Sequence, residues 1–244
     1  PIIGQIIHNQ KAEPDVVLKH PKSVIAEAFR RVRLRLEFLS GEIKNPIIAV
    51  SSSMPGEGKT FCALNIASVY AISGKRTILL GFDLRRPGLN KILDMHQQTG
   101  ISNYLIGQCP LDEIVKNVLH ENLFVISSGD IPPNPSELIS SDKTRQFLAD
   151  LRSQFDVIII DTPPMGIVSD PYLIARQADV LIFLARENYS IRDVFLQSMH
   201  AIHDEGLQHV GILLNDQMVQ HRRYGYRYGG HQYHYGSQTG YYED

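Results

Sequence analysis

The stretch that decides the fold runs from residue 47 to residue 60 and reads I-I-A-V-S-S-S-M-P-G-E-G-K-T. Its first four residues, Ile47–Val50, are apolar, as expected of a strand that is covered on both faces. Residues 53–60 match the pattern G-x-x-x-x-G-K-[ST], except that Ser53 replaces the first glycine. An amphipathic stretch, residues 59–73, follows directly. A strand, a glycine-containing loop and a helix in this order are typical of a loop that binds phosphate.

The backbone and side chains of this loop suit the phosphates of a nucleoside triphosphate. Gly56 and Gly58 let backbone N–H groups approach phosphate oxygens closely. Lys59 is expected to contact the β- and γ-phosphates, and the Thr60 hydroxyl to bind Mg²⁺. We therefore predict ATP and Mg²⁺ as cofactors, while a Gly-Lys-Thr that occurs by chance in a loop is the alternative. The expected nucleotide-binding residues of the loop are Pro55, Gly56, Glu57, Gly58, Lys59, Thr60 and Phe61.

Short apolar runs recur after this loop, at intervals that leave room for helices. The runs are Thr77–Phe82, Leu123–Ile126, Val157–Ile160, Val180–Leu184 and Val210–Leu214, and amphipathic stretches cover residues 142–153 and 190–204. The runs are rich in β-branched residues and mostly continuous, as in strands that are buried on both faces. This alternation predicts an α/β fold, namely a P-loop NTPase with a doubly wound, mostly parallel β-sheet flanked by helices.

The parts of the chain differ in composition. Residues 1–20 contain several turn-forming residues and are expected to form an N-terminal arm, followed by one domain over residues 21–216. Residues 22–39 are predicted to be a helix that ends at Gly41, because apolar residues recur there at helical spacing. These apolar residues are Ile25, Phe29, Val32, Leu36 and Leu39. Residues 217–244 contain seven tyrosines and almost no aliphatic residues, which predicts a disordered tail.

The overall composition argues against several classes of protein. Lys and Arg number 24 and Asp and Glu 26, so the net charge near −2 gives no reason to expect a nucleic-acid partner. No apolar run approaches the ~20 residues that are needed to cross a bilayer. Cys62 and Cys109 lack the spacing of a metal or redox site, which favours a reducing compartment. The first residue is Pro1 rather than Met, so we expect a piece of a longer protein, with a processed chain as the alternative.

Three polar residues follow apolar runs and are expected near the phosphate loop. Asp161 ends the run F-D-V-I-I-I-D, and its carboxylate can hold Mg²⁺ directly or through water; a helix cap is the alternative role. Asp83 is expected to bind Mg²⁺ or to accept a proton from an attacking hydroxyl, with a simple pairing to Arg85 as the alternative. Asn215 both donates and accepts hydrogen bonds, so it is a candidate for reading a nucleotide base or for forming a turn.

In this order, the motifs resemble those of the bacterial tyrosine kinases (BY-kinases), the cytoplasmic kinase domains of co-polymerase proteins in capsule and exopolysaccharide export. The resemblance covers nearly the whole chain. It rests on P-K-S-V-I-A-E-A-F-R-R-V-R, S-S-M-P-G-E-G-K-T, F-D-L-R-R-P, G-D-I-P-P-N-P-S-E-L-I, I-I-I-D-T-P-P, L-L-N and the tyrosine cluster. The family motif D-x-D-x-R begins at Gly81 here, so its first acid is missing.

The resemblance implies a P-loop kinase over residues 21–216, which transfers the γ-phosphate of ATP to tyrosines of its own tail and of partners. Because the first acid is absent, the resemblance implies that Asp83, together with Asp161, performs the catalytic roles of the family's carboxylates. The implied catalytic residues are Lys59, Asp83, Asp161 and Arg85, and the implied Mg²⁺ ligands are Thr60, Asp83 and Asp161. The expected phosphorylation sites are Tyr224, Tyr226, Tyr228, Tyr233, Tyr235, Tyr241 and Tyr242.

The resemblance also implies partners. The family's oligomerisation motif, E-x-x-R-x-x-R, corresponds to Glu27, Arg30 and Arg33 within residues 21–40, although a solvated arginine-rich surface is the alternative. It implies a homo-oligomer, a head-to-tail ring in which each tail enters its neighbour's site. A membrane activator, fused or separate, and a tyrosine phosphatase are further implied partners. The implied location is the inner face of the bacterial cell membrane.

Other functions stay open on the sequence. The rivals are a nucleotide-switched ATPase, related to those that partition DNA or place division sites, and a scaffold that holds nucleotide to stabilise an assembly. Those ATPases carry a lysine where Met54 stands here, and they lack a tyrosine-rich end. The tail could instead stack on single-stranded nucleic acid, bind a metal through His221, His231 and His234, or be a passive terminus.

Overall fold

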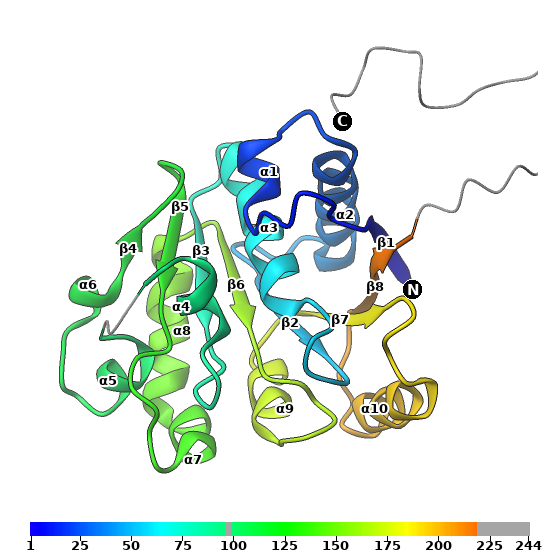
Figure 1. The fold of residues 1–244 in the computed structure, drawn as a ribbon. Coiled ribbons are helices and arrows are strands. Elements are labelled where there is room, and N and C mark those ends of the chain that lie inside the picture. The colour runs from blue at the N-terminus through cyan, green and yellow to red at the C-terminus, as the bar shows by residue number, and fades with distance from the viewer. Residues whose placement is uncertain (96–98, 219–244) are drawn as a thin grey trace, which may run out of the picture.

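A computed structural model of the chain describes residues 1–95 and 99–218. The described strands form one sheet in the order β1-β8-β7-β2-β6-β3-β5-β4 (Figure 1). They are β1 (Ile2–Ile7), β2 (Ile47–Ser52), β3 (Thr77–Gly81), β4 (Lys116–Asn117), β5 (Leu123–Ile126), β6 (Val157–Asp161), β7 (Val180–Arg186) and β8 (Val210–Gln217). Neighbouring strands are parallel except for β4 and β5, which are antiparallel. The six predicted strands and the mostly parallel sheet are confirmed.

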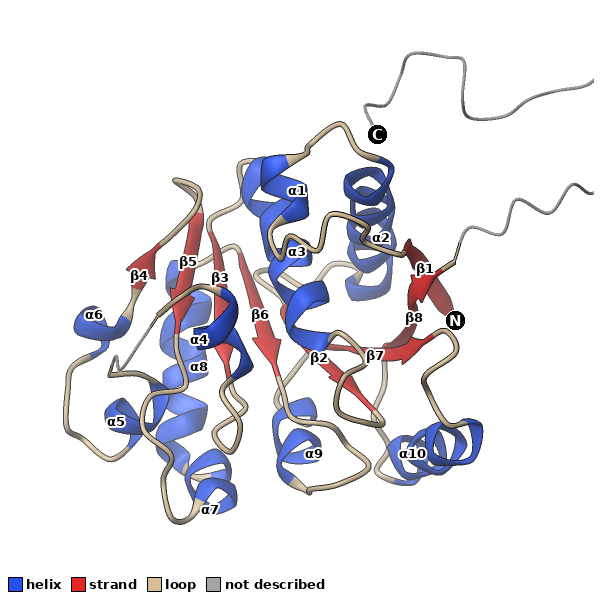
Figure 2. Ribbon diagram, viewed as in Figure 1, coloured by secondary structure: helices blue, strands red, loops and turns tan. Residues whose placement is uncertain are grey.

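Helices cover both faces of the sheet (Figure 2). One face packs against α1 (Val16–Lys19), α2 (Val24–Ser40), α3 (Lys59–Ile72) and α4 (Gly88–Ile92). The other face packs against α5 (Ile101–Leu105), α6 (Leu111–Ile114), α7 (Pro135–Ser140), α8 (Asp142–Gln154), α9 (Asp170–Ala175) and α10 (Arg192–Asp204). This arrangement confirms the doubly wound architecture, and α3, α8 and α10 match the predicted helices to within two residues.

Strand β2 shows why the strands are continuously apolar. Ile48 and Val50 point into the core that contains α2 and α3, whereas Ile47 and Ala49 point into the core that contains α8. Successive side chains of a strand alternate between the two faces, so a strand that is covered on both sides buries every residue. All six residues of β2 are buried, and this removes its apolar surface from water, which is the main stabilising term of such a sheet.

Residues 1–20, for which an N-terminal arm was predicted, contribute a strand to the sheet. Strand β1 pairs with β8 in parallel, and both Ile3 and Ile6 are buried. Gly4 faces α2 so closely that an added Cβ would lie 2.4 Å from Cγ2 of Val32. The strand escaped prediction because it is a short edge strand with a glycine and a glutamine in its middle. The two-residue strand β4 escaped because both of its residues are polar and exposed.

Helix α2 forms as predicted. The Ser23 hydroxyl caps its start by accepting the N–H of Ala26 at 3.2 Å, and Gly41 ends it with a φ of +59°. Its buried side includes Phe29, which is fully buried, while charged residues cover much of the opposite side. Within the described ranges, no helix has both the length and the apolar composition that a membrane crossing requires.

Candidate active site

The phosphate loop lies between β2 and α3, at the carboxyl edge of the central strands. Gly56 and Gly58 have φ angles of +81° and +92°, which residues with a side chain rarely adopt. Gly58 is also the residue that precedes the first turn of α3, so the start of a buried helix faces the loop. Free backbone N–H groups and the helix dipole make this an environment for phosphate.

Lys59 is held by the end of β2 and by the loop backbone. Its ammonium donates to the Ser52 hydroxyl at 3.1 Å and to the Met54 carbonyl at 3.4 Å. Burial lowers the pKa of Lys59, and the carboxylates of Asp161 and Asp83 oppose that shift because they favour the charged form. Both of these hydrogen bonds go to uncharged oxygens, and the ammonium group is placed where the lysine of a phosphate loop can bind phosphate oxygens.

Asp161 ends β6 directly beside the start of α3. Its Oδ2 accepts a hydrogen bond of 2.7 Å from the Thr60 hydroxyl, whereas its Oδ1 is buried and has no hydrogen-bond partner. Burial raises the pKa of Asp161 to about 7, although the bond from Thr60 and the charge of Lys59 pull it down. A buried carboxylate oxygen without a partner, next to a hydroxyl, is a set of donor atoms that fits Mg²⁺. The structure thus does not support the helix-cap alternative for Asp161.

Asp83 lies two residues beyond the end of β3 and is half-buried. Its Oδ1 accepts the backbone N–H groups of Arg85 at 3.2 Å and Arg86 at 2.9 Å. Burial raises the pKa of Asp83, and these two N–H bonds reduce the rise. The carboxylate is therefore oriented by backbone while one of its oxygens stays free of these bonds.

Gly81 occupies the position where the family motif has its first acid. It is the last residue of β3 and is buried, and a Cβ there would lie 3.3 Å from the backbone nitrogen of Ser128. Such a distance is tighter than most Cβ contacts, so a carboxylate at this position would require the Ser128 backbone to shift. The missing acid is consistent with this close packing between β3 and the segment that follows β5.

The Arg85 side chain does not pair with Asp83, which was the alternative considered for this acid. Its guanidinium binds Asp170 with two bonds, 2.6 Å from Nε and 3.1 Å from Nη2, and also donates to Ser136. Burial alone would raise the pKa of Asp170, but the hydrogen bonds from Arg85 and Ser136 outweigh it and lower that pKa. Arg85, predicted to be catalytic, therefore ties the segment after β3 to the start of α9.

Glu57, predicted to bind nucleotide, has its side chain beneath the loop and fully buried. The carboxylate accepts bonds from the Ser53 hydroxyl (3.0 Å), the Met54 N–H (2.7 Å) and the Ser190 hydroxyl. Ser53 thus has a role of its own at the position where the common pattern has glycine, because its hydroxyl helps to hold this carboxylate. Only the backbone of Glu57 is left to face a ligand.

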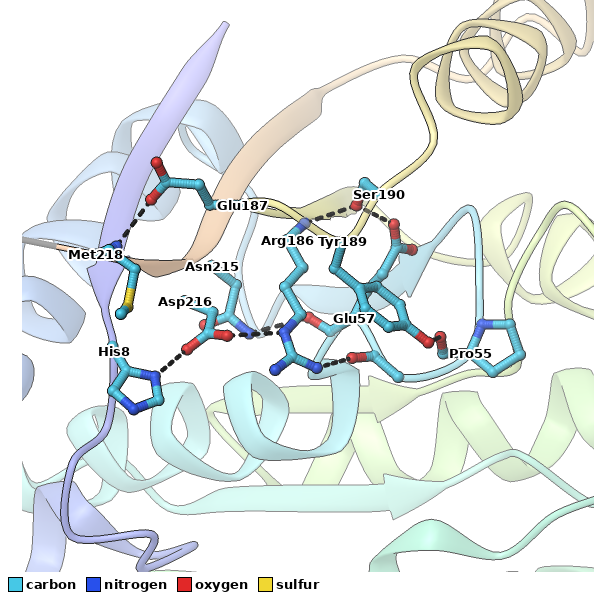
Figure 3. A network of polar contacts seen from close by, with 11 residues as sticks. His8, Pro55, Glu57, Arg186, Glu187, Tyr189, Ser190, Asn215, Asp216 and Met218 are labelled. Carbon is cyan, nitrogen blue, oxygen red and sulfur yellow. Dashed lines mark hydrogen bonds and ion pairs between the residues drawn. The ribbon is translucent and has the colours of Figure 1, made fainter.

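Side chains from outside the loop bind its other surface, as Figure 3 shows. We call Arg186, Tyr189 and Asn215 the carbonyl clamp, since each donates to a backbone carbonyl of the loop. Asn215 lies inside β8 rather than in a turn, so the structure contradicts the turn-forming alternative. Its amide is buried and engaged with the loop backbone in this structure.

A pocket of about 150 Å³ opens beside the loop. It is lined by Ile7, Asn9, Ala12, Gly56, Gly58, Phe61, Arg186, Asn215 and Asp216. Two of the predicted nucleotide-binding side chains, Phe61 and Asn215, therefore border the same space as the loop glycines. The N-terminal segment contributes to it as well, because the end of β1 lies next to the end of β8.

Several residues of the site were missed by reasoning from sequence. They are His8, Ser136, Asp170, Arg186, Tyr189, Ser190 and Asp216. A usable signal existed for four of them, because ligand sites gather at the carboxyl ends of parallel strands. Arg186, Tyr189 and Ser190 follow the apolar run of β7, and Asp216 follows that of β8 directly after Asn215. The others have no local pattern that marks them.

The remaining predicted residues lie elsewhere. On α2, Glu27 pairs with Arg30 at 3.1 Å, and Arg33 pairs with Glu37 at 3.2 Å. The seven predicted phosphorylation sites and the three tail histidines lie outside the described residues. Among the residues that are described, no cluster of three or more His, Cys, Asp or Glu side chains could hold a metal ion. A magnesium site would therefore rest on two carboxylates, Thr60 and the phosphates of a nucleotide.

Comparison with known proteins gives consistent matches. A family model described as an AAA domain matches residues 45–211. The tyrosine-protein kinase etk of Escherichia coli (strain K12) is 31% identical over 208 residues, which cover 85% of this chain and 29% of the relative. The putative tyrosine-protein kinase CapB of Staphylococcus aureus is 31% identical over 217 residues, covering 88% of this chain and 95% of the relative. The chain thus spans under a third of the first relative and nearly all of the second.

A solved structure agrees with these matches. The crystal structure of the chimerical protein CapA2B2 superposes with a TM-score of 0.84 at 30% sequence identity. The match covers 89% of this chain and 95% of that chain. The likeness therefore extends over the sheet and its flanking helices rather than over the phosphate loop alone.

Proposed function

Because the chain belongs to the bacterial tyrosine kinase family, we propose that it is an ATP-dependent protein-tyrosine autokinase that acts on tyrosines of its C-terminal tail. The observation that carries the proposal is the pairing of Asp161 with Thr60 beside Lys59, with the buried Oδ1 of Asp161 left without a partner. This arrangement suits a magnesium–nucleotide complex. The names of the relatives, tyrosine-protein kinases, support a phenol as the acceptor.

The transfer step follows from the charges at the site. A phenol has a pKa near 10, so at neutral pH it attacks slowly until a base removes its proton. Asp83 accepts that proton while the phenol oxygen bonds to the γ-phosphorus and the bond from this phosphorus to the β–γ bridging oxygen breaks, which releases ADP. Lys59 stabilises the negative charge on the phosphoryl oxygens. Mg²⁺, held by Thr60, Asp161 and Asp83, supplies further charge neutralisation when bound.

The proposed setting is a homo-oligomer, a head-to-tail ring in which each tail enters the neighbouring site. The exposed side of α2 supports self-association. Two apolar side chains, Phe38 (86% exposed) and Leu34 (48% exposed), lie on this helix together with the ion pairs Glu27–Arg30 and Arg33–Glu37. A membrane activator, fused or separate, and a tyrosine phosphatase complete the partners. The proposed place of action is the inner face of the bacterial cell membrane. The proposed role there is the regulation of polysaccharide production, which the likeness of this chain to CapB and to the chimerical protein CapA2B2 supports.

The test is to incubate the purified chain with Mg²⁺ and γ-labelled ATP and to map the label by mass spectrometry. We expect label on tyrosines between residues 219 and 244, loss of label in Lys59→Met, and full label in the control Lys75→Met, which removes an exposed lysine in the turn after α3. Mixing Lys59→Met with a chain cut after residue 218 restores the label if transfer occurs between chains. Free phosphate with unlabelled protein would identify an ATPase instead, and neither product would identify a scaffold.

Oligomerisation is tested separately. Each phosphotyrosine adds about −1.5 to −2 charges, which repel the acidic site and loosen a ring that the tails help to close. We expect light scattering at equal protein concentration to give a smaller mass for the phosphorylated form than for the phosphatase-treated form. Equal masses would contradict the proposed link between tail phosphorylation and assembly.

A further inference from the structure

Three consecutive carbonyl groups of the phosphate loop are bound by the carbonyl clamp. The pairs, donor first, are Tyr189 Oη and the Pro55 carbonyl (3.0 Å), Arg186 Nη1 and the Gly56 carbonyl (2.8 Å), and Asn215 Nδ2 and the Glu57 carbonyl (2.9 Å). The donors lie 134, 130 and 158 residues away from their acceptors in the chain. They come from β8 and from the end of β7 and the loop after it, so the clamp has no counterpart in the local sequence of the loop.

A bond to a carbonyl also fixes the direction of the next N–H group. The peptide unit is planar and almost always trans, so its C=O and N–H point in opposite directions. A donor that holds the Pro55 carbonyl therefore orients the N–H of Gly56, and the other two donors orient the N–H groups of Glu57 and Gly58. Three successive N–H groups are thus directed to the side of the loop opposite the clamp.

Those three N–H groups are available for a ligand. Among the described residues, none accepts a hydrogen bond from the N–H of Gly56, Glu57 or Gly58. Successive free N–H groups in such a loop form a concave site for an anion. The unpartnered donors mark the phosphate side of the loop.

The clamp also gives the two glycines a second reason to be glycine. A Cβ at Gly56 would lie 2.6 Å from the Tyr189 hydroxyl, and a Cβ at Gly58 would lie 2.2 Å from the Asn215 amide nitrogen. Both positions additionally have positive φ angles. Gly56 and Gly58 therefore have no room for a side chain on the clamp side of the loop.

The clamp is itself anchored. Arg186 Nε donates to Asp216 at 2.8 Å, and Asp216 is also hydrogen-bonded with His8 of the N-terminal segment at 2.6 Å (Figure 3). The Arg186 guanidinium stacks over the Tyr189 ring, with 4.9 Å from its central carbon to the ring centroid. The backbone N–H of Arg186 donates to the Ser190 hydroxyl at 2.7 Å. A guanidinium with several bonds in one plane keeps its fork in one orientation.

We propose that Arg186 and Tyr189 are positioning residues of the phosphate loop, which act by holding its carbonyl groups so that the loop N–H groups face the β-phosphate of the nucleotide. Asn215 completes the clamp in this role, beyond any contact with the base. The inference rests on the nucleotide-binding part of the proposed function and is independent of which group accepts the γ-phosphate.

The experiment compares ADP with AMP, because only ADP carries the β-phosphate. Dissociation constants are measured by calorimetry in Mg²⁺ buffer for the wild type, Tyr189→Phe, Arg186→Lys and the double variant. Loss of one hydrogen bond weakens ADP binding about 3- to 10-fold, and the double variant about 30-fold or more. AMP binding changes less than about twofold. The ratio of the AMP dissociation constant to the ADP dissociation constant thus falls. A general loss of structure would weaken both nucleotides and would not produce this change.

Matched controls make the same chemical changes away from the loop. Tyr104→Phe removes the hydroxyl of a tyrosine whose ring packs on Phe147, and Arg176→Lys alters an exposed ion pair with Glu205. Both controls retain the wild-type ratio. A wild-type ratio in the double variant, or an equal loss of ADP and AMP binding, overturns the proposal. If the double variant unfolds below the assay temperature, Tyr189→Phe decides, because it removes a single oxygen atom at a side chain that is 45% exposed.

The two conclusions can fail separately. If the wild type binds ADP with the expected response to the clamp variants, but label from ATP never reaches tyrosine, the autokinase is wrong and the positioning role stands. If the wild type binds neither nucleotide, both are overturned. If label reaches tyrosine and the ratio is unchanged in the variants, only the positioning role is overturned.

Discussion

The acids at two neighbouring strand ends lie at the same edge of the sheet but in different surroundings. Asp161 is fully buried, and Thr60 holds one of its oxygens while the other has no partner. Asp83 is half-buried in a loop, and the backbone N–H groups of Arg85 and Arg86 orient it. A fixed, buried carboxylate suits a metal ligand, whereas a more accessible one suits proton transfer to and from an incoming group. The comparison predicts different effects of the two Asp→Asn substitutions on Mg²⁺-dependent nucleotide binding and on the rate of phosphorylation.

Asp161→Asn is expected to have the largest effect. It removes the anionic oxygens that would hold Mg²⁺, which supplies several kcal/mol of charge stabilisation, so we expect tyrosine phosphorylation to fall by about 10³-fold or more. The enhancement of ADP binding by Mg²⁺ should disappear as well. The control is Asp204→Asn, which alters an exposed acid at the end of α10. Retained Mg²⁺-dependent ADP binding in Asp161→Asn would contradict the assignment of this acid as a ligand.

Asp83→Asn is expected to separate catalysis from binding. A general base contributes about 10²- to 10⁴-fold, so the rate of phosphorylation should fall within that range. The affinity for Mg²⁺ and ADP should fall less than in Asp161→Asn, because Asp83 is only one of the proposed Mg²⁺ ligands and both Asp161 and Thr60 remain. Full phosphorylation would show that Asp83 is not the base. A loss of Mg²⁺ binding as large as that in Asp161→Asn would contradict the different roles assigned to Asp83 and Asp161.

The pH dependence of stability provides a test without nucleotide. The pKa of Asp161 is about 7 in the folded chain because burial opposes its charge, whereas an unfolded aspartate has a pKa near 4. The folded state therefore binds the proton more tightly, and its stability falls as the pH rises from about 4 to about 7. Relative to Asp161→Asn, the wild type should lose about 1–3 kcal/mol over that window.

Urea unfolding in EDTA at several pH values measures this difference. The comparison with Asp161→Asn removes the contributions of the other titrating groups, which both chains share. A difference that stays constant between pH 4 and pH 8 would show that folding does not raise the pKa of Asp161. Asp83→Asn should give a smaller change in the same direction, because burial raises its pKa while two backbone N–H bonds oppose the rise.

Asp170→Asn should have the smallest effect on activity and a moderate one on stability. The change weakens the two bonds to Arg85, whose side chain is 41% exposed, so solvent screens much of the interaction. We expect a loss of about 1–2 kcal/mol in the free energy of unfolding. Phosphorylation should fall only a few-fold, because Asp170 reaches Asp83 through the backbone of Arg85. A rate as low as that of Asp83→Asn would give Arg85 and Asp170 a direct part in catalysis.

The sequence alone determined the phosphate loop, the six main strands and the two acidic strand ends. These features are local: eight consecutive residues define the loop, and each buried strand is a run of apolar residues that ends where its functional residue begins. Parallel strands place their carboxyl ends at one edge, so Lys59, Thr60, Asp83 and Asp161 could be brought together without a structure. The tyrosine-rich tail was likewise visible from composition, although it lies outside the described residues.

Only the tertiary structure decided how these parts are held. Arg85 was a neighbour of Asp83 in sequence, yet its guanidinium binds Asp170, and the Asn215 amide binds the loop backbone. The clamp joins groups that are 130 to 158 residues apart, and no periodic pattern encodes such a pairing. Carbonyl acceptors are identical in every residue, so a sequence cannot mark which of them a distant side chain will meet. That choice depends on strand order and register, which the packing of the whole sheet sets.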